Sequence, residues 1–176
     1  MKYYPINLNL EGKKAVVVGG GKVAERKVMQ LLECGAKVTV ISPKVTKKIR
    51  SLADKSQVNV IDRKYRVGDL KGAVVAIAAT DNPAINKQVP KEAKKKRVLI
   101  NVVDSPELCD FIMPSIIRRG DLVISISTSG KFPFLSKKLR IMLEGLIGEE
   151  YGIELDRLAG LRNKLKTKIS PLRHRG

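Results

Sequence analysis

A glycine-rich turn is the first feature of this chain that could support chemistry. The apolar run Ala15–Val18 leads directly into Gly19 and Gly21, and an amphipathic stretch begins near Val23. Gly19 lets the chain turn sharply, Gly21 lets the backbone approach a pyrophosphate, and Ala24 allows a helix to pack closely on a strand. The pyrophosphate would lie on the free N–H groups at the positive end of that helix. The pattern predicts a dinucleotide site, with a purely structural turn as the alternative.

The residues expected to recognise the ribose depart from the common pattern. A carboxylate usually binds the ribose 2′-hydroxyl at the end of the second strand of such a site. This chain has Ser42, Pro43 and Lys44 there and no acidic residue. Ser42 or backbone groups would then contact the ribose, and Lys44 weakly favours a 2′-phosphate and therefore NADP. The alternative is that Ser42 and Pro43 only end a strand and start a helix.

Two polar residues follow later apolar runs. Thr80 comes after Ala73–Ala79, and Asp104 comes after the strand-like residues 98–103. Ligands of open α/β sheets bind at the carboxyl ends of the strands, so Thr80 is a candidate wall for the nicotinamide side. Asp104 could accept the proton that is released when a hydride leaves carbon. Spacing alone favours a turn or helix-cap role for Asp104, which precedes Ser105 and Pro106.

The elements that would position these residues alternate over roughly the first hundred residues. Strands are predicted at 16–18, 37–41, 58–61, 73–79 and 98–101, and helices at 23–34, at 45–53 and from 81 onward. Such alternation predicts an α/β fold, a Rossmann-like parallel sheet with helices on both faces.

The pattern changes after residue 101. Residues 111–117 and 122–126 read as two strands of a hairpin, and amphipathic helices are predicted at 133–146 and 149–168. These helices have too little chain for a core of their own, so we expect them to pack on a second copy, giving a homodimer. The alternative is that they fold back on the sheet. The expected organisation is a Rossmann domain at 1–113, a small mixed dimerisation segment at 114–147 and a C-terminal helical segment at 148–176.

Composition narrows the classes of partner. The net charge of +18 produces a field that attracts polyanions. The basic residues are spread along the chain, and three Phe and four Tyr without Trp give no obvious ladder for stacking bases. An acidic small molecule fits the charge equally well, and the scattered basic residues disfavour nucleic acid as a partner.

The apolar runs and the metal-ligating residue types of the sequence bear on membrane insertion and metal binding. No run approaches the roughly 18 apolar residues of a membrane span, and no signal core follows the N-terminus. We expect a cytoplasmic protein without membrane contact. Two Cys and one His give no cluster with metal-ligand spacing, so no bound metal is expected.

Taken together, several blocks resemble the precorrin-2 dehydrogenase family of siroheme synthesis. The resemblance runs from Pro5 to about Gly148, and the blocks that carry it are residues 17–27, 35–40, 78–81, 101–104 and 110–114. It implies oxidation of precorrin-2 to sirohydrochlorin with NAD, so NAD replaces NADP as the expected cofactor. It also implies a dimer in which the two copies exchange elements that follow the Rossmann domain. Some family members also insert ferrous iron, so a bifunctional dehydrogenase and ferrochelatase is one alternative. A nucleotide-sensing regulatory Rossmann module is another, from a different class of function.

The resemblance also implies roles for individual residues. It assigns Asp104 as general base, and places cofactor contacts at Gly21, Lys22, Val23, Ser42, Pro43, Lys44 and Thr80. Ser127, Thr128 and Ser129 match a small-residue loop facing the tetrapyrrole cleft, although Ser129 and Lys131 replace residues that are often smaller or neutral. Precorrin-2 carries acetate and propionate groups, so candidate carboxylate partners are Arg118, Arg119, Lys131, Lys137 and Lys138. Their alternative is an ordinary solvated surface.

Overall fold

The computed structural model describes residues 2–169, with side chains described as far as Leu165. The chain divides between Ile112 and Met113 into two compact units. The finer division of the second part into segments 114–147 and 148–176 stays a prediction. In the part of the chain that the structure describes, no helix has the length and apolar character needed to cross a membrane.

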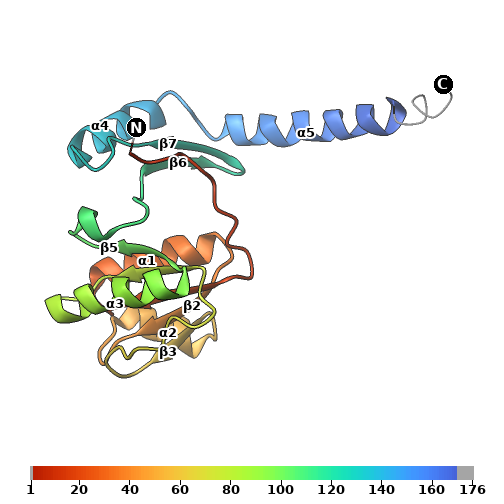
Figure 1. Cartoon of the computed structure of the whole chain (residues 1–176). Coiled ribbons are helices and arrows are strands. Elements are labelled where there is room, and N and C mark those ends of the chain that lie inside the picture. The colour runs from red at the N-terminus through yellow and green to blue at the C-terminus, as the bar shows by residue number, and fades with distance from the viewer. Residues whose placement is uncertain (1, 170–176) are drawn as a thin grey trace. The chain divides into compact units, whose positions relative to one another are not determined.

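The first unit is built on a five-stranded parallel sheet (Figure 1). Its strands are β1 (Lys14–Val18), β2 (Lys37–Ile41), β3 (Val58–Ile61), β4 (Val75–Ala78) and β5 (Leu99–Val102). The spatial order β3-β2-β1-β4-β5 makes β1 central. The chain builds outward on one side of β1 and then restarts on the other, so the strand order reverses between β1 and β4. The carboxyl ends of strands at such a reversal form the ligand-binding crevice of open α/β sheets. The predicted Rossmann-like α/β fold is confirmed.

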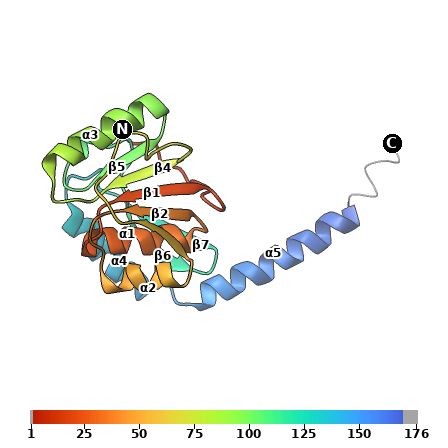
Figure 2. The ribbon, with the colours of Figure 1, turned by 90° about the horizontal axis from the view of Figure 1, so that it is seen from below.

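Among the described residues of this unit there are three α-helices: α1 (Lys22–Glu33), α2 (Lys47–Asp54) and α3 (Pro83–Lys96) (Figure 2). The start of α3 is fixed by Asn82, whose side chain accepts hydrogen bonds from the N–H groups of Ala84 and Ile85. Thr46 caps α2 in the same way by accepting from Ile49 N–H. By contrast, the N-cap residue of α1 is Gly21, which has no side chain to cap the helix. The first N–H groups of α1 therefore remain available, because a helix supplies no partners for them.

The core of the first unit lies on both faces of the sheet. Val16 and Val18 belong to a buried cluster that includes Val89 and Ala93 of α3. Alternation along β1 turns its odd-numbered residues to the opposite face, and α1 packs against β1 and β2. The sheet is thus covered on both sides, which agrees with its near-continuous apolar strands.

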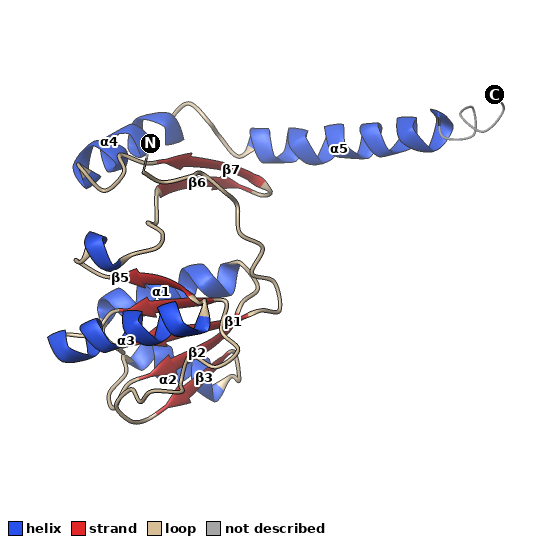
Figure 3. Cartoon of the chain, viewed as in Figure 1, coloured by secondary structure: helices blue, strands red, loops and turns tan. Residues whose placement is uncertain are grey.

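Within residues 113–169, the second unit contains a hairpin and two helices (Figure 3). Its elements are β6 (Ser115–Arg119), β7 (Leu122–Ile126), α4 (Pro133–Glu144) and α5 (Glu150–Ile169). Arg119 pairs with Leu122, so the turn is Gly120-Asp121, and Gly120 has the positive φ of 57° that such a tight turn needs.

The predicted start of the first hairpin strand, at residue 111, is wrong. The strand begins at Ser115, four residues later. Residues 110 and 111 are instead bound to β5, where Asp110 N–H donates to Ile100 O and the Asn101 amide donates to Phe111 O. Pro114 has no N–H to give to a strand ladder, which also favours the later start.

Candidate active site

Gly19 allows the end of β1 to approach the end of β4. Its φ is 122°, and a Cβ at this position would lie 2.0 Å from Ala79 O. Its N–H donates to Ile41 O at 3.0 Å, which ties the turn to β2 as well. Only glycine satisfies both the backbone conformation and the close approach.

Gly20 has a role that the sequence analysis missed. A Cβ there would lie 2.1 Å from Lys44 O and 2.8 Å from Ser42 Oγ. Thr46 N–H donates to Gly20 O at 3.0 Å. The loop after β2 therefore packs directly on the glycine turn. The only signal for this in the sequence is the run of three glycines, since the dinucleotide motif leaves the middle position open.

Gly21 leaves space at the start of α1. It has extended backbone angles, with φ −79° and ψ −173°, and apart from its two chain neighbours no described residue has an atom within 4 Å of a Cβ built on it. The next residues, Lys22 and Val23, form the first turn of α1, and the Lys22 ammonium lies 3.4 Å from Glu25 Oε1. An uncapped helix start with open space before it fits a pyrophosphate group.

The three residues predicted to contact the ribose form a turn after β2. Ser42 is buried, and its hydroxyl donates to Lys44 O at 2.6 Å and accepts from Lys44 N–H at 3.4 Å. Since a hydroxyl has one hydrogen to donate, Ser42 can only accept a bond from a ribose hydroxyl. Pro43 and Lys44 are exposed beside it. The ribose contacts of all three stay a prediction.

Thr80 is held firmly at the carboxyl end of β4. The preceding residue, Ala79, donates its N–H to Val18 O at 2.8 Å, so Thr80 lies next to the glycine turn. Thr80 Oγ1 accepts from Asn82 N–H at 3.1 Å, and the Asn86 side-chain amide donates to Thr80 O at 2.7 Å. Asn86 was not singled out from the sequence. The predicted nicotinamide wall is thus a fixed part of the sheet edge.

Asp104 follows β5 at the same edge. Val103 N–H donates to Ala78 O at 2.9 Å, which places the turn carrying Asp104 beside the end of β4. Asp104 is exposed and has a positive φ of 59°. The short 3₁₀ helix η1 (Pro106–Leu108) that follows has Ser105 at its N-cap position, so Asp104 is a turn residue and not a cap. Gly19, Thr80 and Asp104 therefore emerge from three adjacent strands at one edge.

The predicted substrate residues belong to the second unit. Arg119 Nε donates to Ile147 O at 2.9 Å and lies 3.4 Å from Glu149 Oε1, so this guanidinium holds the chain after α4. Arg118 is exposed, and its Nε donates to Gly120 O at 3.2 Å. In the loop of Ser127, Thr128 and Ser129, the side chains bind backbone groups of the same loop. Ser127 Oγ accepts a hydrogen bond from Ser129 N–H, and Thr128 Oγ1 accepts one from Phe132 N–H.

Lys131, Lys137 and Lys138 are all exposed in this unit. Within residues 2–169, no group of three His, Cys, Asp or Glu side chains could hold a metal ion.

Comparisons with known proteins agree on one family. Residues 6–115 match a family described as putative NAD(P)-binding. The chain is 40% identical to the siroheme synthases of Nitrosococcus oceani and Ruthia magnifica over 175 and 176 residues, which is 99% of this chain but 37% of each relative. A solved structure described as SirC, precorrin-2 dehydrogenase, is 32% identical, with a TM-score of 0.80 over 91% of this chain and 79% of that one. The chain belongs to the precorrin-2 dehydrogenase family.

Proposed function

We propose that this chain oxidises precorrin-2 to sirohydrochlorin in siroheme biosynthesis, with NAD as the hydride acceptor. The observation that carries the proposal is the meeting of three features at one sheet edge. These are the open start of α1 at Gly21, the fixed backbone of Thr80 and the exposed carboxylate of Asp104. A nucleotide cradle and a carboxylate at the same edge are what removal of a hydride and a proton requires.

Each part of the site would have a separate role in the reaction. The N–H groups at the start of α1 would hold the pyrophosphate, and Thr80 would line the nicotinamide side of the site. NAD, when bound, supplies the acceptor for one hydride from a carbon of the macrocycle. The Asp104 carboxylate takes the proton that leaves in the same oxidation, so two hydrogens and two electrons are removed from the substrate in total. An exposed carboxylate can then return this proton to solvent.

We further propose that the chain acts as a homodimer in the cytoplasm, where NAD is available. Large apolar side chains of the second unit are exposed, among them Phe134 at 78%, Ile153 at 71% and Leu146 at 68%. Exposed apolar patches of this kind mark contact surfaces in soluble proteins. The net charge of +18 supports an acidic substrate such as a tetrapyrrole bearing several carboxylates.

The test is a direct assay with precorrin-2 and NAD. Reduced cofactor and sirohydrochlorin are followed by absorbance, with NADP in a parallel reaction. We expect both products to appear together and NAD to be the better cofactor. Asp104→Asn should lower kcat by about 10²–10⁴-fold while the Kd for NAD is kept, which is the range for losing a general base.

A matched control is Asp54→Asn, at the exposed end of α2. This variant should keep full turnover. Absence of any NAD-dependent sirohydrochlorin would overturn the proposed function. Full turnover in Asp104→Asn would remove only the role of Asp104.

A further inference from the structure

The chain after β5 folds back onto that strand through a half-buried thiol. Val102 N–H donates to Cys109 Sγ at 3.1 Å. The same sulfur lies 3.2 Å from Val102 O and 3.3 Å from Ser105 O, so its single hydrogen can be donated to either carbonyl. Val102 and Ser105 are the residues on either side of the Val103-Asp104 turn. One side chain therefore closes the turn from both ends.

The neighbours of Cys109 hold the returning chain in place. Asn101 is buried, and its side-chain amide donates to Phe111 O at 3.0 Å. Asp110 pairs with Ile100 twice, because its N–H donates to Ile100 O at 2.9 Å and its carboxylate accepts from Ile100 N–H at 3.1 Å. Asp110 and Phe111, which follow Cys109, thus bind β5 and keep the Cys109 sulfur beside that strand.

The turn needs such support because of its backbone conformation. Asp104 has a φ of 59°, in the left-handed region. Among residues with a Cβ, Asp and Asn tolerate this region best, yet it still persists only where the surroundings hold it. Bonds from Cys109 on both sides of the turn supply that restraint.

We propose that Cys109 is a positioning residue for Asp104, holding the turn that aims its carboxylate at the substrate. The inference rests on the proposed role of Asp104 as general base. A base works only when it lies within hydrogen-bond reach of the proton that it accepts, and a displacement near 1 Å can cost about 10²-fold in rate.

The chemistry of the thiol agrees with this role. Burial raises the pKa of the Cys109 thiol above its ordinary value, so it stays protonated at neutral pH and keeps a hydrogen to donate.

The test is a double-mutant cycle between Cys109 and Asp104. Cys109→Ala removes both hydrogen-bonding functions, and we expect kcat to fall by about 10-fold or more with an unchanged KM for NAD. Cys109→Ser keeps a donor and an acceptor and should recover most of the turnover. In the Asp104→Asn background, Cys109→Ala should cause no additional loss, because coupled residues are not additive.

Two further variants guard against a folding effect. Cys34→Ala removes the exposed cysteine at the end of α1 and should leave kcat unchanged. Cys109→Val fills the space of the thiol with a somewhat larger apolar side chain and suits the extended backbone, with φ −98° and ψ 132°, so it replaces the alanine variant if that one does not fold. We expect Cys109→Val to lose turnover as Cys109→Ala does.

Several outcomes would overturn the inference, and they differ from failure of the proposed function. Wild-type kcat in both Cys109→Ala and Cys109→Val overturns it while the dehydrogenase stands. Independent losses that multiply in the double variant also overturn it, because Cys109 then acts on the fold rather than through Asp104. Full turnover in Asp104→Asn removes the general base and the inference with it. Failure of the proposed function itself is seen in the wild-type chain, as absence of NAD-dependent product.

Discussion

At the residue scale, the three consecutive glycines of the first turn have three different surroundings. Gly19 faces the backbone of Ala79, and Gly20 faces that of Lys44. Gly21 faces open space at the start of α1. The first two positions bring segments of protein together, and the third leaves room for a ligand. Substitutions at Gly20 and Gly21 should therefore separate stability from cofactor binding.

We expect Gly21→Ala to fold with a free energy of unfolding within about 1 kcal/mol of the wild type, because its φ of −79° suits alanine but alanine is a poorer N-cap residue than glycine. Its new Cβ enters the space proposed for the pyrophosphate, so NAD should bind more weakly. Gly20→Ala should instead lose about 1–3 kcal/mol of stability, because its Cβ would lie 2.1 Å from a backbone oxygen. Urea unfolding and calorimetric titration with NAD measure the two effects. Wild-type affinity in Gly21→Ala would contradict the proposed cradle.

The roles of some of these residues can be predicted from sequence patterns, and the roles of others cannot, for a physical reason. Gly19 and Gly21 follow from a motif whose spacing reflects the path of a single turn. Asp104 can be placed at the sheet edge because it follows a recognisable strand. Gly20 and Cys109 act on segments that are distant or looped back, and their contacts exist only once β2 and β5 have folded. Single-sequence patterns carry no information about such contacts.

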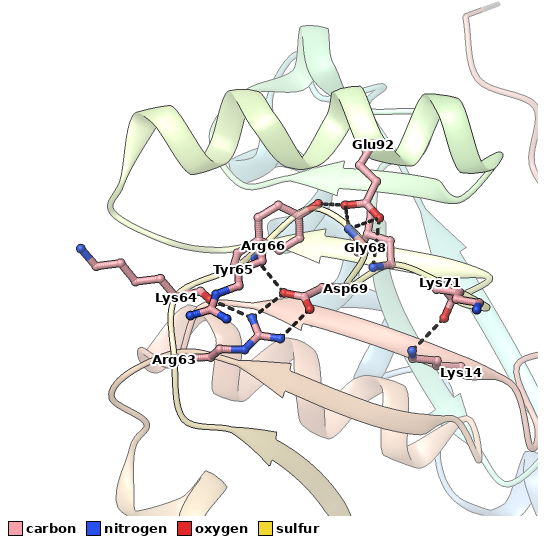
Figure 4. A network of polar contacts seen from close by, with 10 residues as sticks. Lys14, Arg63, Lys64, Tyr65, Arg66, Gly68, Asp69, Lys71 and Glu92 are labelled. Atoms are coloured by element: carbon pink, nitrogen blue, oxygen red, sulfur yellow. Dashed lines mark hydrogen bonds and ion pairs between the residues drawn. The ribbon is translucent and has the colours of Figure 1, made fainter.

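At the element scale, the segment between β3 and β4 is held by a buried carboxylate (Figure 4). Glu92 of α3 accepts hydrogen bonds from the Tyr65 hydroxyl and from the N–H groups of Gly68 and Leu70. Burial and the nearby Glu92 raise the pKa of Tyr65 well above its ordinary value, so the hydroxyl stays a donor. The periodicity of the sequence identifies no helix or strand between residues 61 and 73. Part of what holds this segment is therefore Glu92, which lies more than twenty residues further along the chain.

An ion pair in the same segment predicts a pH dependence of stability. The Arg63 guanidinium forms two hydrogen bonds with Asp69, at 2.8 and 2.7 Å, and lowers the pKa of that carboxyl below its ordinary 3.8. The folded state then binds the proton more weakly than the unfolded state, so the pair stabilises the fold above about pH 4 and this contribution is lost as the pH falls further. Asp69→Asn should cost about 1–2 kcal/mol near neutral pH.

The measurement is urea unfolding of wild type and Asp69→Asn, from about pH 7 down to about pH 3. The difference in unfolding free energy between the two proteins should shrink as the pH falls below 3.8, the ordinary pKa of an Asp carboxyl. Asp54→Asn, at an exposed position, serves as the control. A difference that stays constant down to the lowest pH would show that the ion pair does not contribute in this way.

At the scale of the whole molecule, the two units differ in how fully they bury apolar side chains. The first has cores on both faces of its sheet. In the second, Ile117 of the hairpin is fully buried, whereas the leucines of α5 at 155, 158, 161 and 165 are between 37% and 59% exposed. The spacing of these leucines predicts the helix but cannot say what covers it. We propose that a second copy of the chain covers these leucines, and the oligomeric state of the protein tests this.

We therefore expect the protein to sediment at twice the 19.4 kDa mass of one chain. Phe134→Asp combined with Ile153→Asp should shift it to monomer, since each buried large apolar side chain contributes about 1.5–3 kcal/mol and two such losses raise the dimer Kd by about 10²-fold or more. Val67→Asp is a matched control, because Val67 is 70% exposed, almost equal to the 71% of Ile153, but belongs to the first unit. This control should remain dimeric. A wild-type chain that sediments as a monomer at micromolar concentration would overturn the dimer, and dissociation by Val67→Asp alone would move the interface to the first unit.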